Sequence, residues 1–409
     1  MERNDPRYQA YVEILKEELI PAMGCTEPIA LAYAAAKARE VLGVLPDSVQ
    51  LQVSGSIIKN VKSVIVPNTG HLKGMEAAVA AGIIAGSAEK ELEVISEVSE
   101  EKKSAIRDYL QTVPITIEHT EQGHVFDIVV TERCGQDYAR VRIADYHTNI
   151  CRIEKNGTVL YEVPLLDETV QEDARADRSL LNMQDIWDFA ETADLRDVAD
   201  LLERQIRYNN AIAEEGLLGD YGANIGRVLL TTYGNDVSNR AKAKAAAGSD
   251  ARMNGCELPV IINSGSGNQG ITCSVPLIEY AKELHSGKEK LYRALIISNL
   301  VAIHEKTGIG TLSAYCGAVS AGAGAGAGIV YLCGDGYQAA IHTVVNALAI
   351  VSGIVCDGAK ASCAAKIASS VDAALLGYNM YKCNQEFKGG DGIVMKDIET
   401  TIKGIGRLG

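Results

Sequence analysis

The spacing of apolar residues divides the chain into helical ends and a strand-rich middle. Residues 8–42 carry apolar side chains at helical spacing and predict two helices. From Ser48 the period changes to two, which predicts strands over 49–53 and 61–66. Short alternating runs over 113–163 predict more strands. Between the two strand regions we expect one helix over 75–88 and an acidic helix over 89–111, and helical patterns return beyond Asp167. This order favours an α+β protein.

The same pattern predicts how the domains are built from the chain. We expect a mainly helical domain made of residues 1–46 and 168–409, with an inserted α+β domain over 47–167 whose sheet is mostly antiparallel. An insertion of this kind brings the first helices back to the C-terminal part of the chain. Cys25 would then lie beside cysteines about 300 positions later.

Two segments of the helical part need a specific interpretation. Ser320–Gly328 alternates glycine with small residues, and each glycine costs roughly 0.5–1 kcal/mol in a helix. A flexible linker would explain it, but no hydrophilic residue intervenes, so close packing on another helix or a cofactor is the other interpretation. Ala339–Cys356 is mostly apolar yet contains His342 and Asn346, which favours a buried helix over a membrane span.

Composition and charge exclude several classes of protein. With 47% hydrophobic and 22% charged residues over 409 positions, the chain is globular. A formal net charge of −14 argues against a nucleic-acid partner. The charged N-terminus lacks a secretory signal, which predicts a cytoplasmic protein whose ten cysteines are thiols or metal ligands.

Four cysteines stand out by their surroundings. Cys25 follows Met-Gly near the start, and Cys316, Cys356 and Cys363 lie among small residues near the end. An iron-sulfur cluster is the leading interpretation, although buried cysteines often act only as small apolar residues. Zinc fits less well, because the paired Cys-x2-Cys hooks of structural sites are missing. The other six cysteines have weaker contexts and are treated as structural.

Local breaks in the helical pattern would place these thiols. Cys25 falls at a helix-to-helix junction, where free backbone N–H groups depress thiol pKa values. Cys356 and Cys363 would be roughly 10.5 Å apart on one unbroken helix, which is too far for shared ligation. Asp357-Gly358 supplies a break, so that one helix ends near Cys356 and the next begins near Ser362.

A polar turn follows the strand-like segment 258–262. Asn263–Gly270 contains a G-x-G-x-x-G match, but Pro276 interrupts the expected helix, and no βαβ unit follows. We therefore reject a dinucleotide site and expect the turn, with Ser266, Asn268 and Gln269, to hold a small carboxylate. A plain tight turn explains the pattern nearly as well.

A second polar cluster lies in the middle of the chain. Ser54, Asn60 and His71 are candidates for substrate contacts across the domain junction, although turns alone explain most of them. No lysine stands beside a convincing phosphate loop, so pyridoxal phosphate (PLP) is not expected.

Taken together, these motifs resemble the L-cysteine desulfidase family, which is related to the iron-sulfur L-serine dehydratases. The matching segments are Gly24–Pro28, Ser264–Gly270, Cys316–Gly317, and Cys356–Lys360 with Cys363. The resemblance covers essentially the whole chain. The serine dehydratases space their last two ligands more widely than here, so this chain sides with the desulfidases.

The resemblance implies a PLP-independent 4Fe-4S lyase that converts L-cysteine to pyruvate, ammonia and sulfide. Cys316, Cys356 and Cys363 match the three cluster ligands, which leaves one iron open for the substrate sulfur. Cys25 would be the base or an exchangeable fourth ligand, and Ser266, Asn268 and Gln269 would orient the substrate.

Two other functions stay open at this point. L-Serine dehydration would use the same Lewis-acid catalysis, with hydroxide as the leaving group. A non-catalytic sensor, in which a cluster or an amino acid holds the two domains together, belongs to a different class. The sequence does not fix the oligomeric state, and a homodimer is one option.

Overall fold

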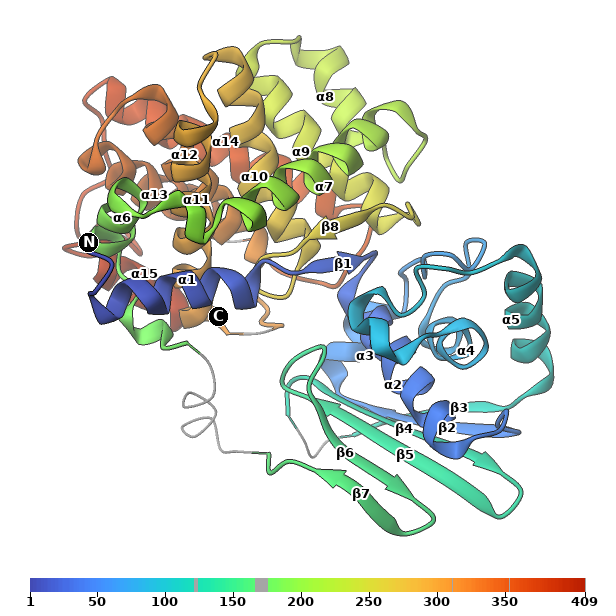
Figure 1. Ribbon diagram of the computed structural model, residues 1–409. Helices are drawn as coiled ribbons and strands as arrows, with labels where there is room; N and C mark the ends of the chain where they lie inside the picture. Colours follow the sequence, from blue (N-terminus) through green and yellow to red (C-terminus); the bar gives the residue numbers. More distant parts are fainter. Residues whose placement is uncertain (121–123, 166–175, 311, 353, 409) are drawn as a thin grey trace.

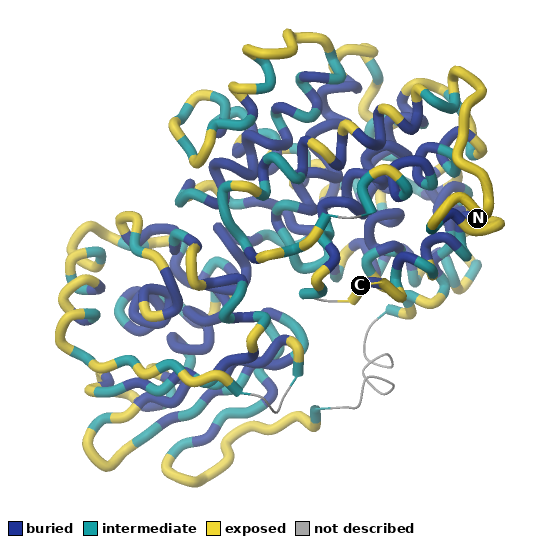
Figure 2. The backbone as a smooth tube through the Cα atoms, turned by 180° about the vertical axis from the view of Figure 1, so that it is seen from behind, coloured by how far each residue is buried: buried dark blue, intermediate teal, exposed yellow. Residues whose placement is uncertain are grey.

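The computed structural model describes residues 1–120, 124–165, 176–310, 312–352 and 354–408, and it confirms the α+β class. Figure 1 shows a large helical unit beside a smaller unit in which helices lie against a sheet. The most buried segments are the helices in the middle of the large unit and the inner helix and strands of the small one (Figure 2).

The small unit is built on a sheet with the strand order β3-β2-β4-β5-β6-β7 among the described residues. Strands β2 and β3 are parallel and the other neighbours are antiparallel, so the sheet is mixed. The strands are β2 Ser48–Val53, β3 Ile115–His119, β4 Asp127–Cys134, β5 Asp137–Ala144, β6 Ile150–Lys155 and β7 Thr158–Glu162. The helices are α2 Thr26–Leu42, α3 Gly55–Val61, α4 Met75–Ala85, the 3-10 helix η1 Ala88–Glu93 and α5 Glu100–Thr112.

Helix α2 packs on this sheet because its small side chains permit a close approach. It contacts β4 and β5 on one side and α4 on another. A Cβ atom added to Gly82 of α4 would lie 2.1 Å from the carbonyl oxygen of Ala32, so only glycine fits there. On β2 the buried residues Val49 and Leu51 alternate with half-buried ones, as a sheet with one covered face requires.

The helical unit surrounds one central helix, α12. Its helices are α1 Pro6–Glu18, α6 Met183–Thr192, α7 Ala199–Leu218, α8 Ile225–Tyr233, α9 Val237–Met253, α10 Gly267–Glu283, α11 Lys288–Ile309, α12 Gly317–Cys333, α13 Tyr337–Val351, α14 Cys363–Lys382 and α15 Ile398–Gly406, with short 3-10 turns η3 Arg178–Leu180 and η4 Leu195–Asp197. Helix α12 contacts α10, α11, α13 and α14.

The glycine run on α12 explains these contacts. A Cβ atom at Gly324 would lie 2.4 Å from the carbonyl oxygen of Ser298 on α11, and one at Gly322 would lie 2.8 Å from the Cβ of Ser370 on α14. The segment is therefore a buried helix on which neighbours pack at backbone distance. The close-packing interpretation of the alternating glycines is confirmed, and the linker interpretation is wrong.

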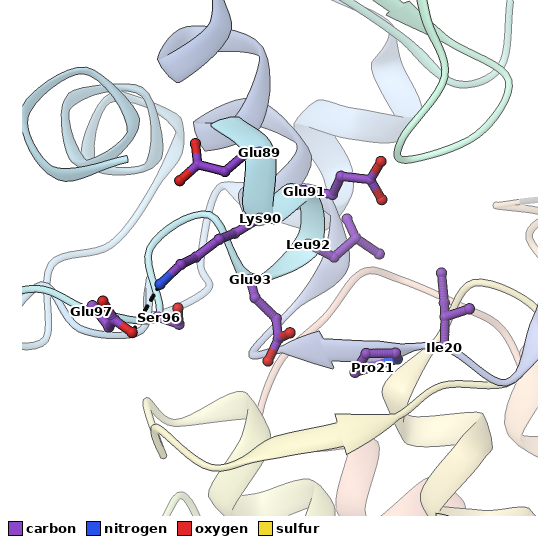
Figure 3. Close-up of a pocket in the computed structure, with 9 residues that line it drawn as sticks. All are labelled: Ile20, Pro21, Glu89, Lys90, Glu91, Leu92, Glu93, Ser96 and Glu97. Atoms are coloured by element: carbon purple, nitrogen blue, oxygen red, sulfur yellow. Dashed lines mark ion pairs between the residues drawn. The ribbon is translucent and has the colours of Figure 1, made fainter. Parts of the chain in front are cut away.

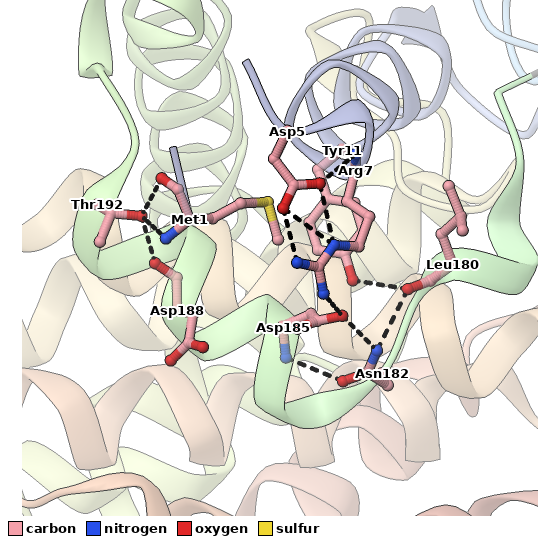
Figure 4. A network of polar contacts seen from close by, with 9 residues as sticks. All are labelled: Met1, Asp5, Arg7, Tyr11, Leu180, Asn182, Asp185, Asp188 and Thr192. Atoms are coloured by element: carbon pink, nitrogen blue, oxygen red, sulfur yellow. Dashed lines mark hydrogen bonds and ion pairs between the residues drawn. The ribbon is translucent and has the colours of Figure 1, made fainter. Parts of the chain in front are cut away.

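The N-terminal segment ties the two units together. Helix α1 is fixed to the helical unit: Arg7 pairs with Asp185 at 2.8 Å, and Tyr11 donates a hydrogen bond of 2.8 Å to the carbonyl oxygen of Leu180 (Figure 4). Strand β1, Pro21–Met23, then pairs antiparallel with β8, Pro259–Ile261. The chain passes from this small sheet directly into α2.

This packing bears on where the units divide. Since α2 lies on the sheet, we propose that the first boundary falls close to Gly24 and not after residue 46. The predicted second boundary, between 167 and 168, lies outside the described residues.

Several local predictions were wrong. Val61 ends helix α3, and the following extended residues form only an isolated bridge between Ile65 and Lys73 instead of a strand. The acidic segment 89–111 is not one helix but most of the 3-10 helix η1 followed by most of α5. Helix α10 continues through Pro276 because its other backbone hydrogen bonds and its many buried residues stabilise it. No helix in the described ranges is long and apolar enough to cross a membrane.

Candidate metal and substrate site

A short antiparallel bridge places Cys316 beside Cys356. Tyr315 bridges Val355, the N–H of Cys316 donates to the carbonyl oxygen of Ile354 at 3.2 Å, and the N–H of Cys356 donates to that of Ala314 at 2.7 Å. Two segments 40 positions apart in sequence thus run side by side at the start of α12. Cys316 is the N-cap residue of that helix.

The loop between α13 and α14 brings Cys363 to the same place. As predicted, the helix is broken before Ser362, and α14 begins at Cys363. Gly358 has φ +102°, and a Cβ atom there would lie 2.4 Å from the carbonyl oxygen of Lys59 on α3. Lys59 in turn donates from Nζ to the carbonyl oxygen of Cys356 at 3.4 Å. The small unit therefore contacts the cysteine loop directly.

Cys25 lies at the N-cap of α2, buried against the same loop. Gly24 has φ +60° and its Cα faces Pro67, so the turn into α2 requires glycine. The Cys25 side chain is 1% exposed, and its Sγ lies 3.6 Å from Sδ of Met253. Cys25, Met253 and Cys363 belong to one small apolar cluster. The fold brings the four singled-out cysteines into one region.

Burial decides the protonation of these thiols. It raises the pKa of Cys25 to about 12 and that of Cys316 to about 11, and it also raises the pKa of Cys363. Opposing this, Cys25, Cys316 and Cys363 all sit at helix N-termini, where backbone N–H groups favour thiolates. Without a metal the side chains are neutral thiols, and a bound metal deprotonates coordinating thiols.

Cys316, Cys356 and Cys363 supply thiol sulfur, the type of ligand that holds iron-sulfur clusters. In the part of the chain that is described, no three His, Cys, Asp or Glu side chains come close enough to hold one metal ion. A 4Fe-4S cluster needs a wider arrangement, because each cysteine binds a different iron. Two lysines also lie near the thiols. Lys366 donates to the carbonyl oxygen of Val355 at 2.8 Å, and Lys306, whose pKa is lowered to about 8 by burial, lies near Cys356 and Cys316.

The predicted substrate turn lies against these cysteines. Ser266 is the N-cap residue of α10, and Asn268 accepts a hydrogen bond of 3.1 Å from Nη1 of Arg252. Gln269 lies over the start of α12, where a Cβ atom on Gly317 would be 2.6 Å from its side chain. The Oε1 atom of Gln269 is buried without a hydrogen-bond partner.

Asn60 also faces this region, through a contact that was not predicted. Its Nδ2 donates to Oε1 of Glu27 at 2.9 Å, while its Oδ1 is buried without a partner. Thr26 Oγ1 lies 3.1 Å from Oε2 of Glu27 and 3.0 Å from the carbonyl oxygen of Gly265. The first turn of α2 is thereby joined to the substrate turn.

Ser54 and His71 occupy other positions. Ser54 donates from Oγ to the carbonyl oxygen of Val125 at 2.7 Å and stands at the N-cap of α3. His71 is exposed in a left-handed turn with φ +68°, near Gly255. Among the described residues, neither has a hydrogen bond to the other predicted site residues. Their role in binding substrate stays a prediction.

Three residues near the cysteines were missed by sequence reasoning. Arg252 is 3% exposed and Glu27 is 9% exposed, and both lie on helices whose other buried residues are mostly small or apolar. His147 comes from the turn between β5 and β6, and its ring lies 3.2 Å from where a Cβ of Gly265 would be. Burial lowers the pKa of His147, so the ring is neutral. Arg252 and Glu27 stand near helix ends, where charges of their sign are common, so the sequence carries no local signal that they are buried.

A hollow elsewhere on the surface is not this site. Its lining, drawn in Figure 3, comes from the start of β1 and from η1 with the turn after it, and contains no cysteine. Glutamates dominate the lining, and its one lysine, Lys90, is paired with Glu97 at 2.9 Å. An open acidic surface of this kind has no means of binding iron through sulfur.

Comparison with known proteins gives a consistent result. The family model for the serine dehydratase alpha chain matches residues 89–409. A UPF0597 protein of Desulfitobacterium hafniense is 62% identical over 409 residues, which are 100% of this chain and 95% of that protein. UPF0597 proteins of Lachnoclostridium phytofermentans and Treponema denticola are 53% and 47% identical, over 97% and 99% of this chain and 95% of each relative. The chain therefore belongs to the serine dehydratase alpha chain family, among UPF0597 proteins related to the iron-sulfur serine dehydratases.

Proposed function

We propose that the protein is a PLP-independent L-cysteine desulfidase that eliminates sulfide from L-cysteine. The observation that carries the proposal is the grouping of Cys316 and Cys363, at two helix starts, with Cys356 in the adjoining loop and Cys25 buried nearby. Three thiolates leave one iron of a cubane without a protein ligand. When bound, the cluster supplies a Lewis acid that stabilises negative charge on the departing sulfur.

The protein's own residues then have separate tasks. Cys316, Cys356 and Cys363 hold the cluster, while Ser266, Asn268 and Gln269 orient the substrate at the start of α10. Cys25 removes the α-proton. Burial raises the pKa of the Cys25 thiol to about 12, so the thiol must first release its own proton to water. The resulting thiolate, which the nearby Arg252 guanidinium favours, is then a strong base for the α-proton.

The reaction balances without a further oxidant or reductant. The α-proton moves to Cys25 Sγ, the Cα–H electrons form the Cα–Cβ double bond, and the Cβ–S bond breaks with its pair on sulfur. Aminoacrylate tautomerises to an imine, which water converts to pyruvate and ammonia. The surrounding apolar residues Val64, Met253 and Ala359 limit the access of water to the thiolate.

Anaerobic reconstitution with iron and sulfide, followed by assays for released sulfide and pyruvate, tests the proposal. We expect both products in equal amounts from L-cysteine. Cluster-loaded protein that releases neither product would refute it. Cys316→Ser, Cys356→Ser and Cys363→Ser should each reduce iron content, whereas Cys383→Ser, which changes an exposed cysteine, should not.

L-Serine dehydration is the second candidate, and the match to the serine dehydratase alpha chain model favours it. The two substrates differ only in the leaving group. Comparing kcat/KM for L-cysteine and L-serine on the same anaerobic preparation decides between them.

A further inference from the structure

Two opposite charges are buried near Cys25 without ionic partners. Arg252 and Glu27 are 3% and 9% exposed. Within the described ranges, neither has an oppositely charged side chain at ion-pair distance; their hydrogen bonds go to neutral groups. Buried charges are normally paired, since removing an ion from water is strongly unfavourable. An unpaired buried cation and an unpaired buried anion in one region indicate a ligand that carries both charges.

The guanidinium of Arg252 is prepared for a carboxylate. Of its five N–H donors, one is directed to Asn268 Oδ1 at 3.1 Å, and Nε is buried without an acceptor. The guanidinium lies against the first turn of α10, where a Cβ atom on Gly267 would be 2.3 Å from Nε. A carboxylate there would receive two parallel bonds from the guanidinium and face the N-terminus of α10.

The carboxylate of Glu27 is prepared for an ammonium group. It accepts from Asn60 Nδ2 at 2.9 Å, and Thr26 has a single hydroxyl proton to share between Glu27 and the carbonyl oxygen of Gly265. Several acceptor positions on Glu27 are therefore free. Asn60 Oδ1 is a further buried acceptor without a partner. An ammonium group has three donors and would satisfy both residues.

One short turn links the two charges. Gly265 contacts Thr26, next to Glu27, and Asn268 contacts Arg252, three positions later. Arg252 and Glu27 both lie close enough to Cys25 and His147 to influence the pKa of each. The carboxylate and the guanidinium thus both lie near the Cys25 thiol.

From this geometry we infer that Arg252 and Glu27 form a receptor for the zwitterion of an α-amino acid, with Arg252 binding the α-carboxylate and Glu27, assisted by Asn60, binding the α-ammonium group. The inference deepens the proposed function and rests on it for the identity of the substrate. It adds two substrate-binding residues and explains why the ligand must carry both groups. Because Cys25 lies near both charges, it would be close to the α-carbon of the bound amino acid.

Calorimetric titration of the cluster-loaded protein, under anaerobic conditions, tests the receptor without any need for turnover. The probes are 3-mercaptopropionate, which has the thiol and carboxylate only, and cysteamine, which has the thiol and ammonium only. Arg252→Gln should weaken 3-mercaptopropionate at least about 30-fold and leave cysteamine unchanged, as for truncation of one partner of a buried charge pair. Glu27→Gln should do the reverse. Arg252→Lys should restore part of the binding of 3-mercaptopropionate.

Controls separate a binding role from a structural one. Glu132→Gln changes another buried acidic residue of the small unit, on β4, whose pKa is raised by burial, and should change neither affinity. If Arg252→Gln or Glu27→Gln does not fold, competition in the wild-type protein replaces it: acetate should displace 3-mercaptopropionate only, and methylammonium should displace cysteamine only. Equal weakening of both probes by each variant, or acetate displacing both probes equally, would overturn the inference.

The same data distinguish failure of the receptor from failure of the proposed function. Selective probe binding in a protein that releases no sulfide or pyruvate would leave the receptor standing and refute the lyase. Product release without probe selectivity would support the lyase and refute the receptor.

Discussion

Replacing Gly358 by alanine should release iron from the site while leaving most of the fold intact. Gly358 lies between Cys356 and Cys363, with φ +102°, and its Cα faces the backbone of α3. An added Cβ atom would lie 2.4 Å from the carbonyl oxygen of Lys59 and 3.2 Å from its carbonyl carbon. Both contacts are to backbone, so no flexible side chain can move away, and the loop itself must shift.

The size of the effect follows from two contributions. A positive φ costs an L-residue about 1–2 kcal/mol. The overlap with α3 adds about 1–3 kcal/mol, as is typical of overpacking in a filled interior. The second contribution is the one that matters for metal binding, because relieving it moves the segment that carries Cys356 away from Lys59 and from Cys316.

Gly334→Ala is the matched control for this prediction. Gly334 ends α12 with φ +88°, and an added Cβ atom would meet nothing within 4 Å. It therefore reproduces the backbone penalty without the overlap. Iron and sulfide per chain should fall in Gly358→Ala and stay at the wild-type level in Gly334→Ala, both measured after anaerobic reconstitution. Equal iron contents in the two variants would refute the reasoning.

Three further predictions concern the base, the core and pH. Cys25→Ala should abolish turnover. If Cys25 acts only as the base, the absorption spectrum of the bound cluster should not change. An altered spectrum would indicate that Cys25 is the exchangeable fourth ligand. Gly324→Ala should lower the melting temperature, because the added Cβ atom would lie 2.4 Å from the carbonyl oxygen of Ser298. Gly308→Ala, whose added Cβ atom has its nearest contact at 3.6 Å, should raise the melting temperature by gaining about 0.5–1 kcal/mol of helix propensity. A lower melting temperature in Gly308→Ala would contradict this. Burial raises the pKa of Asp250 from 3.8 to about 6, so its favourable contribution is complete below 3.8 and is lost as pH rises through 6. The melting temperature of Asp250→Asn relative to wild type should therefore rise between pH 5 and pH 7, and a constant difference would show that Asp250 does not titrate there.

Sequence reasoning identified the α+β class and the break between Cys356 and Cys363, because both depend on local signals. An alternating strand pattern and an Asp-Gly pair act within a few residues. The placement of α3 could not be found in this way. Its last residue, Val61, fits a strand pattern with Val64 and Val66, yet Ser54 starts a helix that ends at Val61 and packs against the cysteine loop.

The charged residues of the site were missed for a related reason. Arg252 ends a helix of small residues and Glu27 begins another, and each looks like an ordinary helix-end charge. Whether such a charge has a partner depends on segments far away in sequence. Asn268 and Asn60 provide neutral partners in this fold, and only the packing of α10 and α3 reveals that.

The glycine run of α12 bears on what happens to the protein when oxygen destroys its proposed cluster. Helix α12 is held at backbone distance by direct protein contacts with α11 and α14. Cys316 is the N-cap residue of α12 and Cys363 begins α14, so we expect the scaffold around the proposed cluster to stay folded when the cluster is absent. Oxidative loss of iron would then change the protein only locally and leave a folded apoprotein that can accept a new cluster. Such a protein is suited to repair by delivery of a new cluster and does not have to be made again.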